Sequence, residues 1–217
     1  MRFPNAFRGV KKIWLAELLM LLAAVIGIIL IFVIAANSTL VGDDVVVNKE
    51  AVETPAAILG ILAALIALTA FILNLVGMIN ARNDDAGFRI ALLVTVLGII
   101  TSAVSAIWSS NQTLVKWMDT ATTIFSLFAS YYVLTGIANL AEKLSDSATK
   151  ALALKSRTLL EGTFCATVVF KLIINIFKIQ DGSTIYTILS IVALVLELVS
   201  YLLYLRALSK GKKMLSK

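Results

Sequence analysis

The sequence contains no histidine and only one cysteine, and 15% of its 217 residues are charged. Without histidine, Ser-His-Asp catalysis and histidine-bound metals are excluded. The single cysteine, Cys165, has no partner for a disulfide within the chain, and it lies in an apolar run, where we expect a structural role. Charge is scarce in comparison with soluble domains, in which about 25% of residues are charged.

Catalytic motifs are also lacking. The sequence contains neither a phosphate-binding P-loop nor the His-Glu-x-x-His pattern of zinc proteases. We therefore expect no enzyme activity, no cofactor and no bound metal.

Apolar residues are abundant instead, making up 60% of the chain, against about 45–50% in soluble domains. They form six continuous runs of about 20–25 residues, long enough to cross a bilayer core of about 30 Å. Continuous runs favour helices, because barrel strands alternate. The sequence predicts an all-α, multi-pass protein of the cell membrane, with one domain over 1–217 and six transmembrane helices at 13–36, 55–79, 88–108, 118–140, 158–179 and 184–208.

The connections between the runs are short and polar. The first run is longer than the roughly 7–15 apolar residues of a signal peptide, so we expect it to be retained as a span. For 37–54 we expect a loop in preference to a short strand at 45–47, and we expect Pro55 to open the second span, because proline suits a first helical turn. The 141–157 connection is rich in helix formers and has helical potential.

Lysine and arginine are distributed unevenly along the chain. Of 19 such residues, 15 lie in the two terminal segments and in the connections near 80–89 and 141–157, three lie in the other connections, and Lys171 lies within a span. This alternation predicts that both termini are cytoplasmic. The basic residues then face anionic lipid headgroups, and we expect no nucleic-acid partner.

Several predicted spans carry small or polar residues on one helical face. The face of the third span is explained by helix packing, because membrane helices associate through small residues and hydrogen bonds. It consists of Thr95, Gly98, Ser102, Ser105 and Ser109. The faces of the fifth and sixth spans reach further and are more polar, and packing of small residues does not account for them. They carry Thr163, Thr167, Lys171 and Asn175 on one span, and Glu197, Ser200 and Tyr201 on the other.

Glu197 is the charged residue that is hardest to explain by position alone. It lies far from both ends of its span, where an ionisable group costs about 2.5–3.5 kcal/mol on insertion scales. Its side chain must therefore face protein, water or a counter-charge. Lys171 lies at a similar depth on the preceding span, so we expect the two to pair, either as a structural ion pair or as part of a substrate or proton site.

Glu17 and Glu161 lie near the cytoplasmic starts of the first and fifth spans. A carboxylate there is stabilised by the positive end of the helix dipole. Alternatively, the two line a mouth that attracts cations. Lys171 likewise has the alternative of extending toward the outer surface.

Two functional hypotheses follow. The first is a small transport protein or channel for an ion or small molecule, with Glu197, Lys171, Glu161, Glu17, Thr167, Asn175 and Tyr201 along its pathway. The second is a non-catalytic membrane scaffold, which binds a partner protein or a second copy of itself and moves no substrate. An enzyme acting on lipid is a third alternative.

Overall fold

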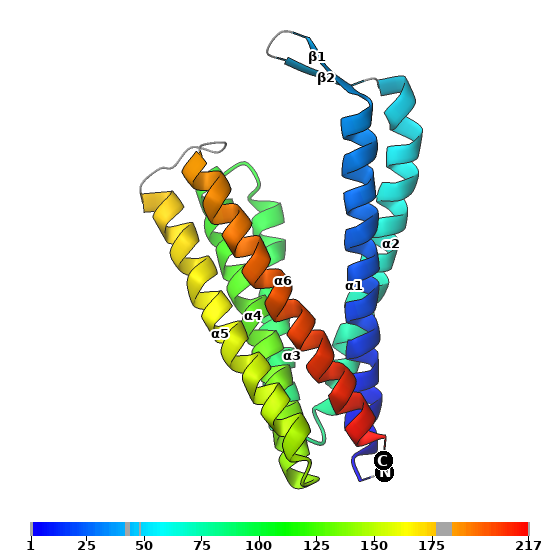
Figure 1. Cartoon of the computed structure of the whole chain (residues 1–217), viewed down its shortest axis with the longest axis vertical. Helices are drawn as coiled ribbons and strands as arrows, with labels where there is room; N and C mark the ends of the chain where they lie inside the picture. Colours follow the sequence, from blue (N-terminus) through cyan, green and yellow to red (C-terminus); the bar gives the residue numbers. More distant parts are fainter. Residues whose placement is uncertain (1, 42–43, 48, 177–183, 217) are drawn as a thin grey trace. The chain divides into compact units, whose positions relative to one another are not determined.

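Helices dominate the structure, which is a computed structural model that describes residues 2–41, 44–47, 49–176 and 184–216. In chain order the elements are α1 (Pro4–Ala36), β1 (Ser38–Val41), β2 (Asp44–Val47), α2 (Lys49–Ala81), α3 (Ala86–Ile107), α4 (Gln112–Lys143), α5 (Ser147–Ile176) and α6 (Thr184–Leu215) (Figure 1).

Five of these helices, α1, α2, α3, α4 and α6, are long and apolar enough to cross a membrane. The sixth helix, α5, is not among these five when the described residues alone are considered. The chain thus has the helices of a multi-pass membrane protein, while the count of six crossings stays a prediction.

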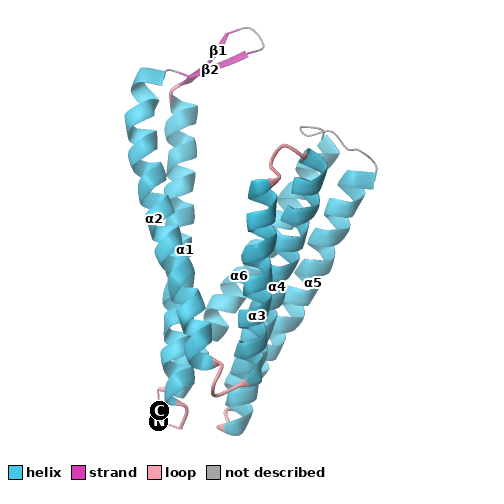
Figure 2. Ribbon diagram, turned by 180° about the vertical axis from the view of Figure 1, so that it is seen from behind, coloured by secondary structure: helices cyan, strands magenta, loops and turns pink. Residues whose placement is uncertain are grey.

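The segment at 37–54, which we expected to be a loop, contains a short β-hairpin (Figure 2). Its strands β1 and β2 are antiparallel, with Ser38 opposite Val47 and Val41 opposite Asp44. The valines of β2 explain this difference, since β-branched residues suit extended strands. The helix that follows begins at Lys49, so Pro55 lies inside α2 and does not open it.

Polar caps also move two helix starts away from the predicted span limits. Asn111 caps α4, accepting a hydrogen bond from the Leu114 N–H at 3.1 Å. Asp146 accepts one from the Thr149 N–H at 2.9 Å beside the start of α5. Much of the 141–157 connection is therefore helix, and the turn between α4 and α5 covers only residues 144–146.

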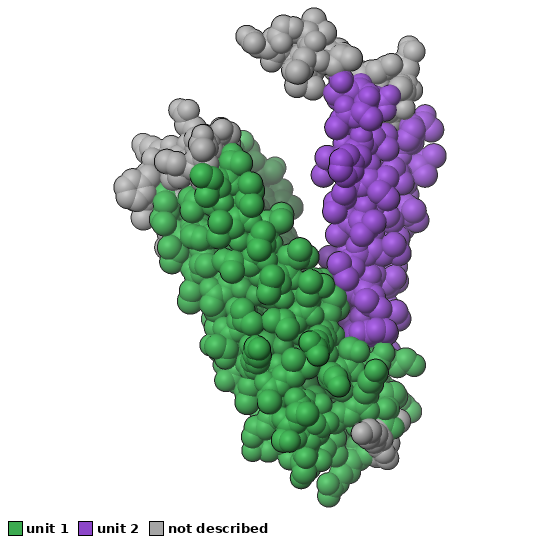
Figure 3. All heavy atoms as spheres, viewed as in Figure 1, with its two compact units in different colours: residues 1–11, 77–217 green, residues 12–76 purple. Residues whose placement is uncertain are grey.

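The chain divides into two units, which are coloured separately in Figure 3. Unit 2 comprises residues 12–76, and unit 1 comprises residues 1–11 and 77–217. Within unit 2, α1 and α2 run side by side, and the Asn74 Nδ2 on α2 donates a hydrogen bond to the Glu17 Oε1 on α1 at 3.4 Å. Most of the large apolar side chains of these helices are exposed, as suits helices that face lipid.

In unit 1, α4 is the central helix and contacts α3, α5 and α6. Its second half supplies much of the core, in which Phe88, Leu134, Ile137, Leu140 and Leu208 are completely buried. Close backbone approach tightens the contact between α3 and α4. A Cβ atom added to Gly87 would lie 2.7 Å from the Gly136 backbone nitrogen, so only glycine fits there.

The polar face of the third predicted span packs against α4. The Ser102 and Thr122 hydroxyls lie 3.4 Å apart, and the Ser105 hydroxyl donates to Asp119 at 3.2 Å. A Cβ on Gly98 would touch Phe125 at 3.4 Å. The packing explanation is therefore supported for three members of this face, Gly98, Ser102 and Ser105.

Candidate functional site

A row of polar contacts joins α5 to α6. Three pairs lie along it: the Ser156 hydroxyl donates to the Leu203 carbonyl at 3.2 Å, Thr163 hydrogen-bonds Ser200, and the Thr167 hydroxyl donates to the Glu197 Oε1 at 3.3 Å. Residue numbers rise on α5 as they fall on α6, so the two helices are antiparallel along the whole row.

Four hydroxyl side chains in this row are buried, and we call Ser156, Thr163, Thr167 and Ser200 the hydroxyl seam. Ser156 and Thr163 also donate to carbonyls one turn earlier in α5, at 2.9 and 3.0 Å. Such bonds satisfy hydroxyls where no water is present, and one bond between membrane helices contributes about 0.6 kcal/mol. Ser156, Thr163 and Ser200 of the seam therefore serve helix association.

Glu197 differs from the hydroxyls, because its residue is exposed at the edge of the contact between α5 and α6. Thr167, which donates to it, is 5% exposed. Exposed apolar neighbours flank Glu197 on α6, with Leu194 65% and Leu198 51% exposed. A carboxylate thus stands among lipid-facing side chains while a buried hydroxyl holds one of its oxygens. The prediction that Glu197 faces a polar group is met by Thr167.

The side chains of Lys171, the predicted partner of Glu197, and of Asn175 lie outside the described residues. The helical backbone fixes their register only. Lys171 follows Thr167 by four residues, about one turn and 6 Å along α5. The ion pair with Glu197 stays a prediction.

The remaining candidates lie apart from this contact. Glu161 forms an ion pair with Arg157 on the same helix at 3.8 Å, which supports its structural interpretation. Glu17 pairs with Asn74 inside unit 2, so a mouth shared with Glu161 of unit 1 also stays a prediction. Tyr201 is half-buried on α6 beside Ser200.

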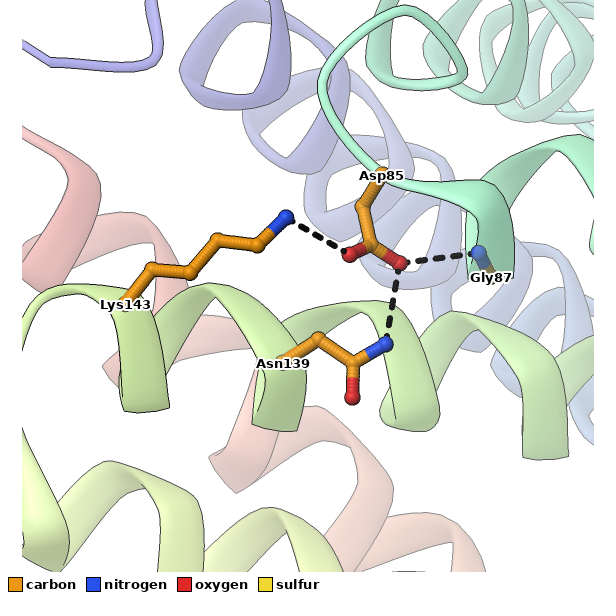
Figure 4. A network of polar contacts seen from close by, with 4 residues as sticks. All are labelled: Asp85, Gly87, Asn139 and Lys143. Atoms are coloured by element: carbon orange, nitrogen blue, oxygen red, sulfur yellow. Dashed lines mark hydrogen bonds and ion pairs between the residues drawn. The ribbon is translucent and has the colours of Figure 1, made fainter.

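A second polar network, which the sequence did not single out, surrounds Asp85 (Figure 4). The Asp85 carboxylate is 5% exposed and accepts hydrogen bonds from the Gly87 N–H at 2.8 Å, the Asn139 Nδ2 at 3.2 Å and the Lys143 Nζ at 3.4 Å. It caps α3 and fixes the start of that helix to the end of α4. A sequence signal existed, because aspartate directly before an apolar helix is a preferred N-cap.

The preceding residue, Asp84, holds the start of α1. Its carboxylate accepts hydrogen bonds from the Ala6 N–H at 2.6 Å and the Asn5 Nδ2 at 3.4 Å. The Lys143 Nζ, which contacts Asp85, also lies 5.9 Å from the centre of the Phe3 ring. Every group in this network has a structural partner, so it explains how unit 1 is held together and offers no free reactive group.

Among the described residues, the contact between α5 and α6 places an exposed carboxylate between exposed apolar side chains of a membrane-length helix. Its chemistry is that of binding: a carboxylate and a hydroxyl attract a proton, a cation or a small polar solute. No protein-family model, curated protein or solved structure matches the chain. The interpretation of the site accordingly depends on its own geometry.

Proposed function

We propose that this chain is a small integral membrane transport protein or channel, with its intramembrane site between α5 and α6. The observation that carries the proposal is the contact of Thr167 with Glu197. Because a charge in the middle of a membrane helix is costly, helices that retain one usually use it on a substrate or ion pathway.

The proposal treats α5 as a sixth crossing. This interpretation is supported by the packing of α5 against α4 and α6, which are both long and apolar enough to cross a membrane. Its 30 residues extend about 45 Å at 1.5 Å per residue. Arg2 and Leu215 line one cavity, which brings the two chain ends to the same side of unit 1, as an even number of crossings requires. The excess of basic residues there favours the cytoplasm.

In this proposal Glu197 meets a proton or a small cation, and Thr167 orients the carboxylate. The other contacts of the hydroxyl seam keep α5 and α6 in register, so that the Glu197 carboxylate stays at the edge between the two helices. No covalent step is involved, and the protein is not an enzyme.

A flux assay in sealed proteoliposomes tests this function. The full chain is reconstituted, and the movement of protons and of small monovalent cations down imposed gradients is followed with fluorescent indicators. We expect flux above that of empty vesicles, and we expect Glu197→Gln to reduce it at least tenfold. Glu142→Gln is the matched control, because Glu142 is an exposed carboxylate paired with Lys150 outside the seam.

The second candidate is the non-catalytic scaffold. The observation in its favour is that the polar groups around Asp85 and along α3 are used to join helices. If wild type, Glu197→Gln and empty vesicles show equal flux, the transport proposal is wrong and the scaffold is preferred.

A further inference from the structure

A cavity of about 580 Å³ lies where the two ends of the chain meet the turn between α4 and α5. Residues from all three segments line it: Arg2, Phe3, Leu144, Ser145, Asp146, Ser147, Ala148, Met214 and Leu215. All of them belong to unit 1. The contact of Thr167 with Glu197 does not use this cavity, and the Asp85 network reaches it through Phe3, whose ring Lys143 contacts.

The walls of the cavity have two chemical characters. Phe3, Leu144, Met214 and Leu215 give apolar surface, whereas Arg2 gives a cation. Two serines, Ser145 and Ser147, add hydroxyl groups. A ligand that matches these walls carries a negative charge and an apolar portion in one molecule.

The one acidic residue in the lining, Asp146, is already engaged. One of its oxygens accepts from the Thr149 N–H and the other from the Thr149 hydroxyl, both at 2.9 Å. These two bonds direct the carboxylate toward the first turn of α5.

Further positive charge surrounds the cavity. Lys212 and Lys213 directly precede the lining residue Met214 on α6. Burial lowers the pKa of Lys212 below its ordinary value, and the charges of Lys11 and Lys213 lower it further. Three cations thus lie close enough to repel one another, which makes this end of unit 1 strongly positive.

We propose that this cavity binds the headgroup of an anionic phospholipid from the adjoining leaflet, with Arg2 contacting the phosphate and the apolar wall receiving the glycerol and the first methylenes. Its size fits, since ligand sites have volumes of about 300–1,000 Å³. Basic pockets at the ends of membrane helices recognise such headgroups. The proposal requires a membrane location, but it does not require transport.

Native mass spectrometry of the full chain, released from nanodiscs that hold equal amounts of phosphatidylglycerol and phosphatidylcholine, tests this site. We expect wild type to retain phosphatidylglycerol preferentially. Arg2→Gln should weaken that retention about fivefold, the factor for roughly 1 kcal/mol per basic residue near an anionic surface. Arg82→Gln is the matched control, because it removes one exposed charge outside the cavity and should change retention little.

A second variant separates the contribution of the cavity's space from the contribution of its charge. Ala148→Trp fills the cavity, leaves every charge in place, and should also reduce retention. Equal losses in Arg2→Gln and Arg82→Gln, full retention in Ala148→Trp, or no lipid preference in wild type would each overturn the proposal. So would glycerol phosphate binding to the detergent-purified chain, dependent on Arg2, without any preference for phosphatidylglycerol, because the anion would then be a soluble phosphate. Melting curves verify that each variant is folded.

Discussion

Thr167 on α5 donates a hydrogen bond to Glu197 on α6, with 3.3 Å between the two oxygens. The donor is buried and the acceptor is exposed. The contact therefore holds a carboxylate at the border between the helix bundle and its surroundings. The proposed function depends on this combination.

The Asp85 network predicts a large loss of stability when its carboxylate is removed. Asp85→Ala deletes an N-cap, which contributes about 1 kcal/mol, and it leaves Asn139 and Lys143 without their acceptor. We expect the free energy of unfolding to fall by about 2 kcal/mol or more, measured by thermal or denaturant unfolding in detergent.

Asp119→Ala provides the comparison for that variant. Asp119 is exposed and accepts one side-chain hydrogen bond, from Ser105, so its loss should cost under about 1 kcal/mol. Equal costs for the two variants would show that the Asp85 network does not hold α3 to α4.

A substitution of Gly87 tests the close approach of α3 to α4. In Gly87→Ala the new Cβ would lie 2.7 Å from the Gly136 nitrogen and 2.8 Å from the Tyr132 carbonyl oxygen. Both are backbone atoms that cannot rotate away, so we expect destabilisation of about 1–3 kcal/mol in the same unfolding assay.

Gly162→Ala is the control, because a Cβ there meets nothing within 4 Å. Alanine is the better helix former by about 1 kcal/mol, so this variant should be unchanged or stabilised. A stable Gly87→Ala protein would contradict the described packing of α3 on α4.

The long apolar helices were predicted well from the sequence, whereas the helix caps and the individual side-chain contacts were not. Long apolar runs identify membrane helices because lipid imposes both length and composition. Gly98, Ser102 and Ser105 of the predicted stripe pack on α4 as small residues in membranes do. The helices are longer than the predicted spans because caps such as Asn111 and Asp146 lie beyond the apolar core, and hydropathy does not register them.

The site could be predicted only in part. Depth along a helix indicates that Glu197 needs a polar neighbour, but depth does not say which one. The neighbour is Thr167, and choosing it requires the rotation of α5 against α6. Asp85 was missed for a related reason, since a pair of aspartates in a short turn resembles any polar connection until Asn139 and Lys143 of α4 come into contact with it.

Sidedness tests whether α5 crosses the membrane. In a Cys165→Ala background, single cysteines at Ser145 and Thr187 flank α5. If α5 spans the bilayer, an impermeant thiol reagent added to intact cells should label Thr187→Cys and spare Ser145→Cys until the cells are opened. Labelling of both positions from the same side would mean that α5 does not cross.

Lys212 predicts a pH dependence of stability. Folding lowers the pKa of Lys212 below 10.5. Between the folded pKa and 10.5 the unfolded chain therefore binds more protons than the folded chain, and stability rises with pH across that window. Below the window the charged lysine carries a constant cost. Near pH 7, Lys212→Gln should therefore have a slightly higher free energy of unfolding than wild type. The gain should be up to about 0.5 kcal/mol, the scale of surface charge interactions.

That gain should shrink as the pH approaches 10.5. The exposed neighbour Lys210 supplies the control, and Lys210→Gln should show no such pattern. A gain that persists unchanged at high pH would mean that the charge of Lys212 is not its cause.

The central claim is that a polar path reaches Glu197 inside the apolar part of α6. Its most direct test compares Glu197→Cys with Leu194→Cys, both in the Cys165→Ala background, using a water-soluble thiosulfonate on reconstituted protein. Leu194 is the matched position, because it lies one turn away and is 65% exposed among lipid-facing side chains. The account predicts that the cysteine at 197 reacts from one side of the membrane while the cysteine at 194 is protected; equal protection of both would contradict it.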